Sequence, residues 1–323
     1  MSNLIIAVLG KNGYSSNLAK KGTSTDITLY NFKKNETTLT FIEPTRYPDR
    51  LAPLFYACSM AKMAIIIVEE LNQTLGESLV MLQTCGIAKG FFILQNYISP
   101  DKIKSLVKDT ILENYQIIPD DPIKLKEILV NELTRIAQIS PKDLDQSYGT
   151  VPVDHAFNVK GIGTVILGVV TKGVIKVHSL LKVLPGIKTT QIRSIQKHDD
   201  NFDNSLEGDR VGLALKNLKV EDVERGTVLT NDPTVKGSNK IKAEASIVKY
   251  WTTPLTEGMI LHVGHWMQFL NCKIETIADD GNWRKPTLTL SLEKEIIYNP
   301  DDIAVLTYLD SGKLRIVGTI KLS

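Results

Sequence analysis

Long apolar runs and closely spaced cysteines are both missing from this sequence of 323 residues. No segment approaches the roughly 18 consecutive apolar residues that a membrane-spanning helix requires. The three cysteines, Cys58, Cys85 and Cys272, show no paired spacing. We therefore expect free thiols, a cytoplasmic location and no thiolate metal cage. All five histidines follow residue 150, so any chemistry in the first half must run without imidazole.

An excess of one charge is also lacking. The chain has 38 Lys and Arg against 36 Asp and Glu, and residues 1–149 hold 16 of each sign. No region is the broadly basic surface that binds duplex DNA by releasing counterions, so a nucleic acid could be bound only in a local basic pocket. The length is sufficient for two or three domains.

The first 145 residues alternate short apolar runs with amphipathic stretches. This alternation predicts a mostly parallel sheet with helices on both faces. The expected strands are 4–9, 27–32, 38–42, 64–68, 90–95 and 115–118, and the expected helices are 49–63, 74–86, one that follows Ser99-Pro100 and one that follows Asp121-Pro122.

Local signals refine these helices. Thr74 and Glu77 have capping-box spacing, so we expect Thr74 to begin the second helix. Apolar residues at helical spacing are expected to face the core. They are Ile103, Leu106, Val107 and Ile111 in the third helix, and Ile128, Leu129, Leu133 and Ile136 in the fourth.

The pattern changes near residues 140–150. Beyond this point, Gly, Pro, Asn or Asp interrupts short β-prone runs, as is typical of β-barrels and sandwiches. A second break lies at residues 231–239. We therefore predict an α/β domain over residues 1–147 and two all-β domains over 148–238 and 239–323.

Five phrases in the first all-β region carry a specific resemblance. They are PVDHAFNVKGIGTVILGVVTKGVIKV, LKVLPGIK, IRSIQKH, EGDRVGLAL and VERGTVL, in this order. Together they closely resemble the second domain of translational GTPases of the elongation factor Tu family, most of all the selenocysteine-specific (SelB) branch. The resemblance implies a P-loop GTPase-like α/β domain followed by two β-barrels, as in elongation factor Tu.

The first domain then resembles a GTPase domain that has lost its nucleotide motifs. A phosphate loop reads G-x-x-x-x-G-K-[ST], in which the lysine neutralises phosphates and the hydroxyl holds magnesium. Counted from Gly10, the second glycine is Ser15, the lysine is Ser16 and the hydroxyl residue is Asn17. Loop amides alone can still bind an anion.

The other GTPase motifs differ in parallel. TFIEPTRYP resembles the switch TFIDTPGH, but Tyr47 replaces its catalytic histidine, and Glu43 can replace its metal-shell aspartate only at a longer reach. ILQNYIS keeps Asn96 of the guanine-reading N-K-x-D but has Ser99 for the aspartate, and serine cannot accept two hydrogen bonds bidentately. The segment around Thr25 retains part of the first switch. It follows so closely that the helix after the loop must be short or absent. The nucleotide-binding remnant that the resemblance marks is Gly10, Asn12, Gly13, Ser15, Ser16, Asn17, Thr25, Glu43 and Asn96.

We therefore expect no GTP hydrolysis, because the loop lysine, the switch histidine and the guanine-reading aspartate are missing. Tight binding of magnesium and GTP is not expected either, nor is any other cofactor. His262 and His265 lie three residues apart in an expected strand and face opposite sides, so no zinc site is predicted.

In relatives of elongation factor Tu, the second domain holds the end of a tRNA. By resemblance, its terminal adenosine would lie against the phrase around Gln196 and His198, whose side chains offer a planar face and a hydrogen-bonding edge. The SelB branch adds a positive pocket, in which His155 replaces an expected arginine. The alternative, that Asp154, Arg193 and Arg210 form ordinary salt bridges, stays open. The candidate ligand residues are Asp154, His155, Ile195, Gln196, His198, Asp209 and Arg210.

The leading hypothesis is a translation factor of the elongation factor Tu and SelB type with eroded GTP-binding motifs. It would bind tRNA ends, the ribosome or another translation component without GTP hydrolysis. Two alternatives stay open, a GTP-binding elongation factor with atypical nucleotide contacts and a protein-interaction scaffold. The expected partners are a tRNA, the ribosome or a translation-related protein, and not DNA or a membrane.

Overall fold

The structure is a computed structural model that describes residues 2–139 and 148–323, with side chains over 3–135 and 148–323. It divides into two compact units, Met1–Ser140 with Leu309–Ile316, and Pro141–Tyr308 with Val317–Ser323. The first is an α/β unit and the second holds two β-barrels. The predicted fold class is therefore confirmed.

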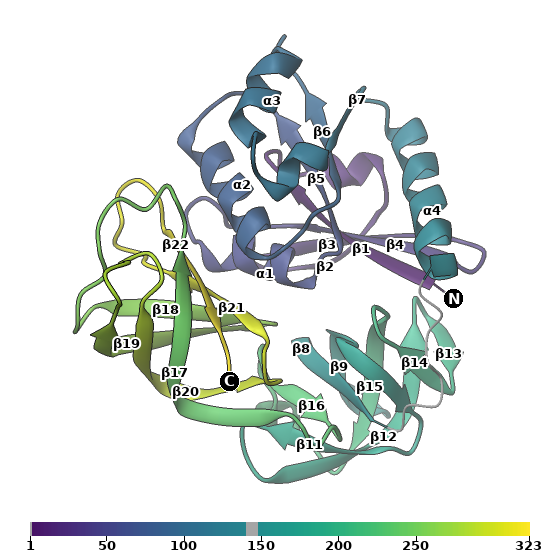
Figure 1. The fold of residues 1–323 in the computed structure, drawn as a ribbon. Coiled ribbons are helices and arrows are strands. Elements are labelled where there is room, and N and C mark those ends of the chain that lie inside the picture. The colour runs from purple at the N-terminus through teal and green to yellow at the C-terminus, as the bar shows by residue number, and fades with distance from the viewer. Residues whose placement is uncertain (1, 140–147) are drawn as a thin grey trace. The chain divides into compact units, whose positions relative to one another are not determined.

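A seven-stranded sheet in the order β2-β3-β4-β1-β5-β6-β7 forms the centre of the α/β unit (Figure 1). Strands β4, β1, β5, β6 and β7 run parallel, and β3 pairs antiparallel with both of its neighbours, β4 and β2. Every residue of β5 is buried, because helices cover both faces of a parallel sheet. The bounds are β1 Ser2–Leu9, β2 Lys20–Ser24, β3 Thr28–Lys34, β4 Thr37–Glu43, β5 Met63–Val68, β6 Gly90–Leu94 and β7 Gln116–Ile118.

Helices lie on both faces of this sheet, as predicted. Leu125, Leu129 and Leu133 of α4 pack in one cluster with Leu4 and Ile6 of β1. Figure 1 shows α4 on one side of the sheet and α1 and α2 on the other. The helix bounds are η1 Tyr14–Asn17, α1 Ala52–Met60, α2 Gln73–Thr84, α3 Pro100–Val107, η2 Ile111–Asn114 and α4 Pro122–Ile139.

Two details of the helices differ from prediction. Asn72 caps α2, with its Oδ1 accepting from the Leu75 amide at 2.8 Å, so the predicted cap at Thr74 is wrong. Helix α3 ends at Val107 and leaves Leu106 43% exposed, so the predicted apolar face is shorter. Ile111 begins the separate 3-10 turn η2. The predicted inward position of Ile136 concerns a side chain outside the described residues.

The first barrel closes through the ring β8-β16-β11-β12-β15-β9, in which β9 pairs back to β8. Gly161 and Gly163, at φ 81° and 99°, make the reversal between β8 and β9, because glycine adopts positive φ at little cost. The bounds are β8 Gly149–Val159, β9 Gly163–Val169, β10 Lys172–Lys176, β11 Leu180–Leu184, β12 Lys188–Lys197, β13 Asp200–Phe202, β14 Asn204–Leu206, β15 Arg210–Lys216, η3 Val220–Asp222 and β16 Val228–Thr230.

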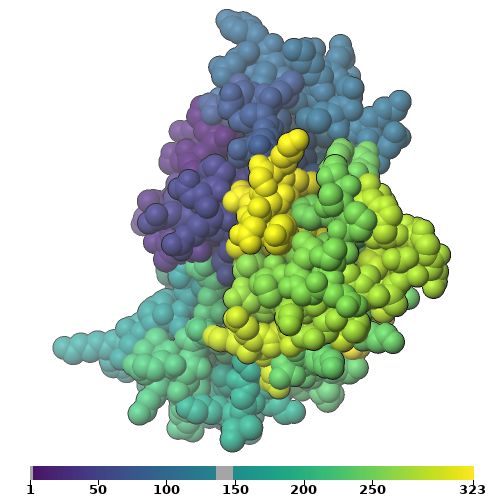
Figure 2. Space-filling model, turned by 90° about the vertical axis from the view of Figure 1, so that its left-hand side faces the viewer, coloured from purple at the N-terminus to yellow at the C-terminus, as the bar shows by residue number. Residues whose placement is uncertain are grey.

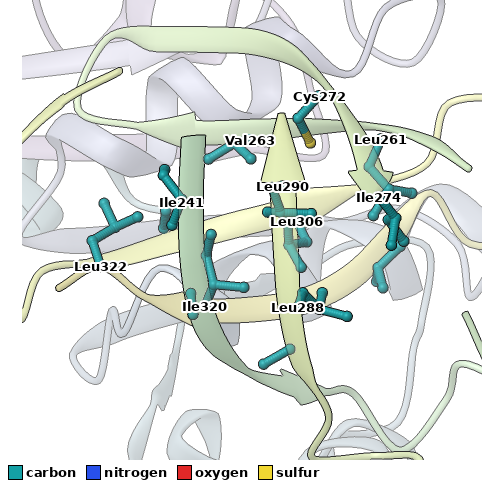
Figure 3. Close-up of a cluster of buried hydrophobic side chains, with 14 of the residues drawn as sticks. Ile241, Leu261, Val263, Cys272, Ile274, Leu288, Leu290, Leu306, Ile320 and Leu322 are labelled. Carbon is teal, nitrogen blue, oxygen red and sulfur yellow. The ribbon is translucent and has the colours of Figure 1, made fainter. Parts of the chain in front are cut away.

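The second barrel closes in the order β17-β20-β19-β18-β21-β22. Figure 3 shows alternate side chains of these strands, such as Ile241, Val263 and Leu290, gathered inside the barrel. The space-filling view shows residues of this barrel, green to yellow, as a continuous packed surface (Figure 2). The bounds are β17 Lys236–Ile247, β18 Ile260–His265, β19 Gln268–Ala278, β20 Thr287–Tyr298, β21 Ile303–Thr307 and β22 Ile316–Lys321.

The predicted domain boundaries remain predictions. The first, between residues 147 and 148, borders residues that the structure does not describe. The second, between residues 238 and 239, falls inside β17, which begins at Lys236.

Candidate functional site

The parallel strands β1, β5, β6 and β7 end at one edge of the sheet. Four loops follow there, at residues 10–13, 69–72, 95–99 and 119–121. Ligands of open α/β sheets bind outside the carboxyl ends of the strands, so this edge is the candidate nucleotide site.

The phosphate-loop remnant leaves β1 through Gly10, which has φ 93°. A Cβ on Gly10 would lie 2.0 Å from the Ile67 carbonyl oxygen of β5, so only glycine fits. Gly13, at φ 84°, then leads into η1, a 3-10 helix of four residues. The helix after the loop is thus short, as its spacing predicts.

The carboxylate of Glu43, at the end of β4, binds the amides of this loop. Its Oε2 accepts from the Gly13 amide at 2.6 Å, and its Oε1 accepts from the Ser15 amide at 2.7 Å. Glu43 is only 2% exposed. Burial raises the pKa of the neighbouring Tyr30, and the Glu43 carboxylate raises it further. The amides that could hold a phosphate therefore hold a side chain of the protein itself.

Lys11 is the one basic residue of the loop, and acidic and amide groups hold it. Its Nζ donates to Glu69 Oε1 at 2.6 Å and to Gln95 Oε1 at 2.9 Å. Gln95 Nε2 donates to Asp120 at 2.6 Å, and the Tyr14 hydroxyl donates to the same carboxylate at 2.7 Å. Burial and Asp120 raise the pKa of Tyr14 well above its ordinary value. This chain of contacts links the loops after β1, β5, β6 and β7.

The other remnant residues make local contacts. Ser16 Oγ donates to the Gly13 carbonyl at 2.7 Å, and Thr25 Oγ1 donates to Asp26 at 3.0 Å. Asn12 Nδ2 donates to the Thr45 carbonyl at 3.5 Å. Asn17 is exposed.

Asn96, from the guanine-reading phrase, also makes a local contact. Its Nδ2 donates to the Glu69 carbonyl at 3.0 Å. Asn96 and Tyr97 have φ of 52° and 58°, and the Tyr97 ring points fully into solvent. Among the described residues, no group of three His, Cys, Asp or Glu could hold a metal ion.

Tyr47, which stands where the family has its switch histidine, is buried and bonded. Its hydroxyl donates to the Thr74 carbonyl at 3.0 Å and to Glu77 Oε2 at 3.1 Å. Burial and then Glu77 raise the pKa of Tyr47. Glu77 also accepts from Arg315 Nη2 at 2.6 Å, and Arg315 Nη1 donates to the Pro48 carbonyl at 3.0 Å. An ionic cluster around the buried Glu77 carboxylate therefore fixes the segment that resembles a switch.

In the first barrel, Asp154, Arg210 and His155 lie together, and the Arg210 and His155 side chains contact the Asp154 carboxylate instead of facing a ligand. Arg210 donates to both oxygens of Asp154, through Nη2 at 3.0 Å and through Nη1. His155 Nδ1 lies 2.6 Å from Asp154 Oδ1. Burial raises the pKa of Asp154, but Arg210 and His155 outweigh that effect and hold the pKa at about 2. Arg210 is only 9% exposed, so its charge stabilises Asp154.

Asp209 is buried and accepts three hydrogen bonds from neighbouring residues of the barrel. Its Oδ2 accepts from Lys197 Nζ at 3.0 Å, from Ser205 Oγ at 3.1 Å and from the Leu206 amide at 3.0 Å. All these contacts lie within the segment from β12 to β15. Asp209 is 1% exposed, so it holds the turn before β15.

The remaining tRNA-end candidates follow one strand and its turn. Ile195 has no exposed surface and packs in the barrel core, so its side chain cannot contact a ligand without rearrangement. Gln196 Nε2 donates to Asn201 Oδ1 across the β12–β13 hairpin at 3.1 Å. His198, at φ 47°, forms the turn of that hairpin.

A pocket of about 490 Å³ in the same barrel lies elsewhere. Arg193 stands at its wall and donates from Nη1 to the Ile162 carbonyl at 3.0 Å. Sequence reasoning named Arg193 only as a salt-bridge residue and missed the other lining residues. The signal was the pair of phrases IRSIQKH and EGDRVGLAL, which supply Arg193 of β12 and Leu215 of β15 to the lining and belong to paired strands. The lining residues are Asn158, Ile162, Gly163, Thr164, Arg193, Leu215, Lys216, Asn217, Leu218, Lys219, Val220 and Glu221.

The two neighbouring histidines of the second barrel have separate partners. His265 Nε2 lies 3.1 Å from Asp302 Oδ2, and the His262 ring stacks on Phe269 at 5.1 Å. Trp251 is buried in the barrel core. Of the helices that the structure describes, none has the length and apolar content to cross a membrane.

Comparison with known proteins gives the following matches. The family model of elongation factor Tu domain 2 matches residues 163–230. An uncharacterised protein of Methanocaldococcus jannaschii is 35% identical over 331 residues, covering 100% of each chain. The selenocysteine-specific elongation factor of the same organism is 28% identical over 264 residues, covering 76% of this chain and 55% of that protein.

Solved structures match over the whole chain. The apo crystal structure of translation elongation factor SelB from Methanococcus maripaludis gives a TM-score of 0.82 at 24% identity, covering 100% of this chain and 80% of that chain. A bacterial selenocysteine-specific elongation factor gives a TM-score of 0.79 at 20% identity, covering 100% and 58%. At these identities the matches establish the fold.

Proposed function

The chain belongs to the translational GTPase family of the elongation factor Tu and SelB type, and from this premise we propose that it binds the end of a tRNA without hydrolysing GTP. The pocket of the first barrel carries the proposal. This pocket is open and lined by three basic side chains, Arg193, Lys216 and Lys219.

The chemistry of the pocket suits a nucleotide end. Its volume of about 490 Å³ lies within the range of roughly 300–1,000 Å³ typical of small-ligand sites. The Arg193 guanidinium is planar and can stack on a base. Lys216 and Lys219 can contact backbone phosphates, and Asn158 and Asn217 can donate to and accept from a base edge. We therefore place the tRNA end here and not on the Gln196–His198 hairpin.

The contacts at the sheet edge support the absence of a nucleotide cycle. Phosphoryl transfer requires cations at the phosphates, whereas Lys11 is paired with Glu69. The loop amides are bonded to Glu43. The Arg210 charge is likewise committed to Asp154, so we do not propose a pocket for an anionic selenolate.

Fluorescence anisotropy with labelled aminoacyl-tRNA and deacylated tRNA at about 0.15 M salt, the physiological ionic strength, tests the proposal. Arg193→Ala should weaken binding roughly tenfold, the worth of one stacked base. Arg135→Ala is the charge-matched control, because Arg135 is exposed on α4 and bonded to Glu132. Magnesium and GTP should leave the tRNA affinity unchanged.

A double-mutant cycle between the protein and the tRNA tests whether Arg193 contacts the terminal nucleotide. If the terminal adenosine stacks on Arg193, removal of that nucleotide and Arg193→Ala should each weaken binding, and together they should cost no more than one of them alone. Equal affinities of the Arg193 and Arg135 variants would reject the pocket. No binding of either tRNA at tens of micromolar, with none to ribosomes, would reject the RNA function.

A further inference from the structure

One contact of the α/β unit that the proposed function does not use joins Glu43 to the phosphate loop. Both carboxylate oxygens accept main-chain amides, at 2.6 Å and 2.7 Å, in a place where Glu43 is 2% exposed. Bonds from amides to an ionised oxygen are short and strong. A carboxylate offers the loop the same oxyanion acceptors that a phosphate would offer.

We infer that the loop retains an anion site and that Glu43 fills it as an internal substitute for a phosphate. The loop keeps the shape that such a site requires, since Gly10 and Gly13 have φ of 93° and 84°. Ser15 lies at its centre, fully buried, and its Oγ has no hydrogen-bond partner among the described residues. We call this site, which Glu43 occupies, the masked site. Its ligand class is a small oxyanion, with inorganic phosphate as the simplest case.

Because Glu43 takes the place of a phosphate, the segment after β4 stays attached to the loop. In nucleotide switches, a terminal phosphate holds the switch segment and releases it on hydrolysis. Glu43 is attached to the segment that it holds, so it cannot dissociate. The same segment is also held by Thr45, whose Oγ1 lies 2.6 Å from Thr28 Oγ1, and by the Arg46 amide, which donates to the Asp26 main-chain carbonyl at 3.0 Å. The loop and this segment therefore stay joined with no nucleotide present.

This inference rests on one part of the proposed function, that the protein works without a GTP cycle. It does not depend on tRNA binding. If Glu43→Ala binds phosphate and the unmodified protein binds no tRNA, only the proposed function fails. If tRNA binds and the variant ignores phosphate, only the masked site fails.

Glu43→Ala is the decisive variant, with sodium phosphate as the probe. Loss of two amide bonds should lower its melting temperature by roughly 5 °C. Phosphate at about 10 mM should raise it again by roughly 3 °C, as expected for a site with an affinity near 1 mM. Sodium chloride at equal ionic strength controls for general salt effects. The unmodified protein should gain nothing specific, because Glu43 occupies the site.

Two further variants sharpen the result. Glu70→Ala removes an exposed carboxylate from the same sheet edge but leaves the loop amides bonded to Glu43 and Lys11 paired with Glu69, so it should not respond specifically to phosphate. Glu43→Gln keeps the volume and one acceptor oxygen, so it should be destabilised but closed to phosphate. Equal phosphate responses of the Glu43→Ala and Glu70→Ala variants would overturn the inference.

A milder change tests the contact if Glu43→Ala does not fold. Glu43→Asp shortens the side chain by one methylene, and the Gly13 and Ser15 amides should exchange their hydrogens at least about tenfold faster, since a lost hydrogen bond costs about 1.4 kcal/mol or more. Amides in the middle of β1 serve as the internal reference. Unchanged exchange at Gly13 and Ser15 would equally overturn the inference.

Discussion

The sheet edge of the α/β unit and the pocket of the first barrel differ in how their polar groups are used. At the sheet edge, Lys11 and the loop amides are bonded to Glu69 and Glu43. In the barrel, Arg193 makes one main-chain contact and otherwise stands at an open pocket. An arrangement whose donors already have internal acceptors gains little from a ligand, because each new bond replaces an existing one. The difference teaches that two polar sites of one chain can differ in whether their donors are already bonded internally or still face an open pocket.

The largest effect expected from this comparison concerns GTP. Under the proposed function, Lys11 pairs with Glu69 instead of a phosphate and Asn17 replaces the magnesium-binding hydroxyl, and each change should cost several kcal/mol. Binding should therefore be at least roughly 10³-fold weaker than a submicromolar site. Isothermal titration with GTP and GDP, with and without magnesium, measures it. A submicromolar, magnesium-dependent affinity would break the comparison and favour a GTP-binding factor with atypical contacts.

The next effect concerns the barrel residues that the family resemblance marked. Asp154→Ala leaves the Arg210 cation buried without a partner, which should lower the free energy of unfolding by roughly 3–5 kcal/mol. Chemical denaturation of the variant measures this loss. Lys294→Ala is the control, because its ion pair with Glu224 is exposed on both sides and should contribute less than about 1 kcal/mol. A variant that loses tRNA affinity but keeps its stability would show that the pair is a ligand site.

The same pair predicts a dependence on acid. The pKa of Asp154 is about 2 in the folded protein, against about 3.9 in an unfolded chain. A lowered pKa contributes stability above the unfolded value, here about 2.5 kcal/mol, and this contribution is lost as the pH falls from about 4 through 2. The stability difference between the unmodified protein and Asp154→Asn should therefore shrink over this range. A difference that stays constant from pH 6 to pH 2 would contradict the assignment.

The sequence predicted the fold well where signals are local. The hairpin of β3 and β4 turns at Asn35, whose φ of 54° suits asparagine. The phrases of the first barrel predicted the barrel fold that β8 to β16 adopt. Helix α3 was predicted too long, because helical spacing continues through Ile111 although the helix ends at Val107. Apolar periodicity alone does not show where a helix stops.

The candidate sites were harder to predict, because their contacts join distant segments. Glu43 reaches Ser15 only because β1 and β4 are parallel neighbours, with Ala7 opposite Ile42. The motif comparison treated Glu43 as a metal-shell substitute, and nothing in the linear sequence names the loop amides as its partner. The barrel pocket likewise combines three separate stretches of chain. Motifs identify the ancestral role of a residue, and only the folded contacts give its present partner.

The smallest predicted effect separates two local signals in the α/β unit. Both Asn72 and Thr74 are good capping residues, but only Asn72 accepts the Leu75 amide, at 2.8 Å. Asn72→Ala should cost about 1 kcal/mol of unfolding free energy, the usual worth of an N-cap. Thr74→Ala should cost clearly less, because the main-chain carbonyl of Thr74, and not its side chain, accepts from the Tyr47 hydroxyl. Denaturant midpoints of the two variants decide the matter. A larger loss for Thr74→Ala would indicate that Thr74 and Glu77 form a capping box after all. Helix α2 would then begin at Thr74, and the Glu77 carboxylate would be used at the helix start as well as in its bond with Tyr47.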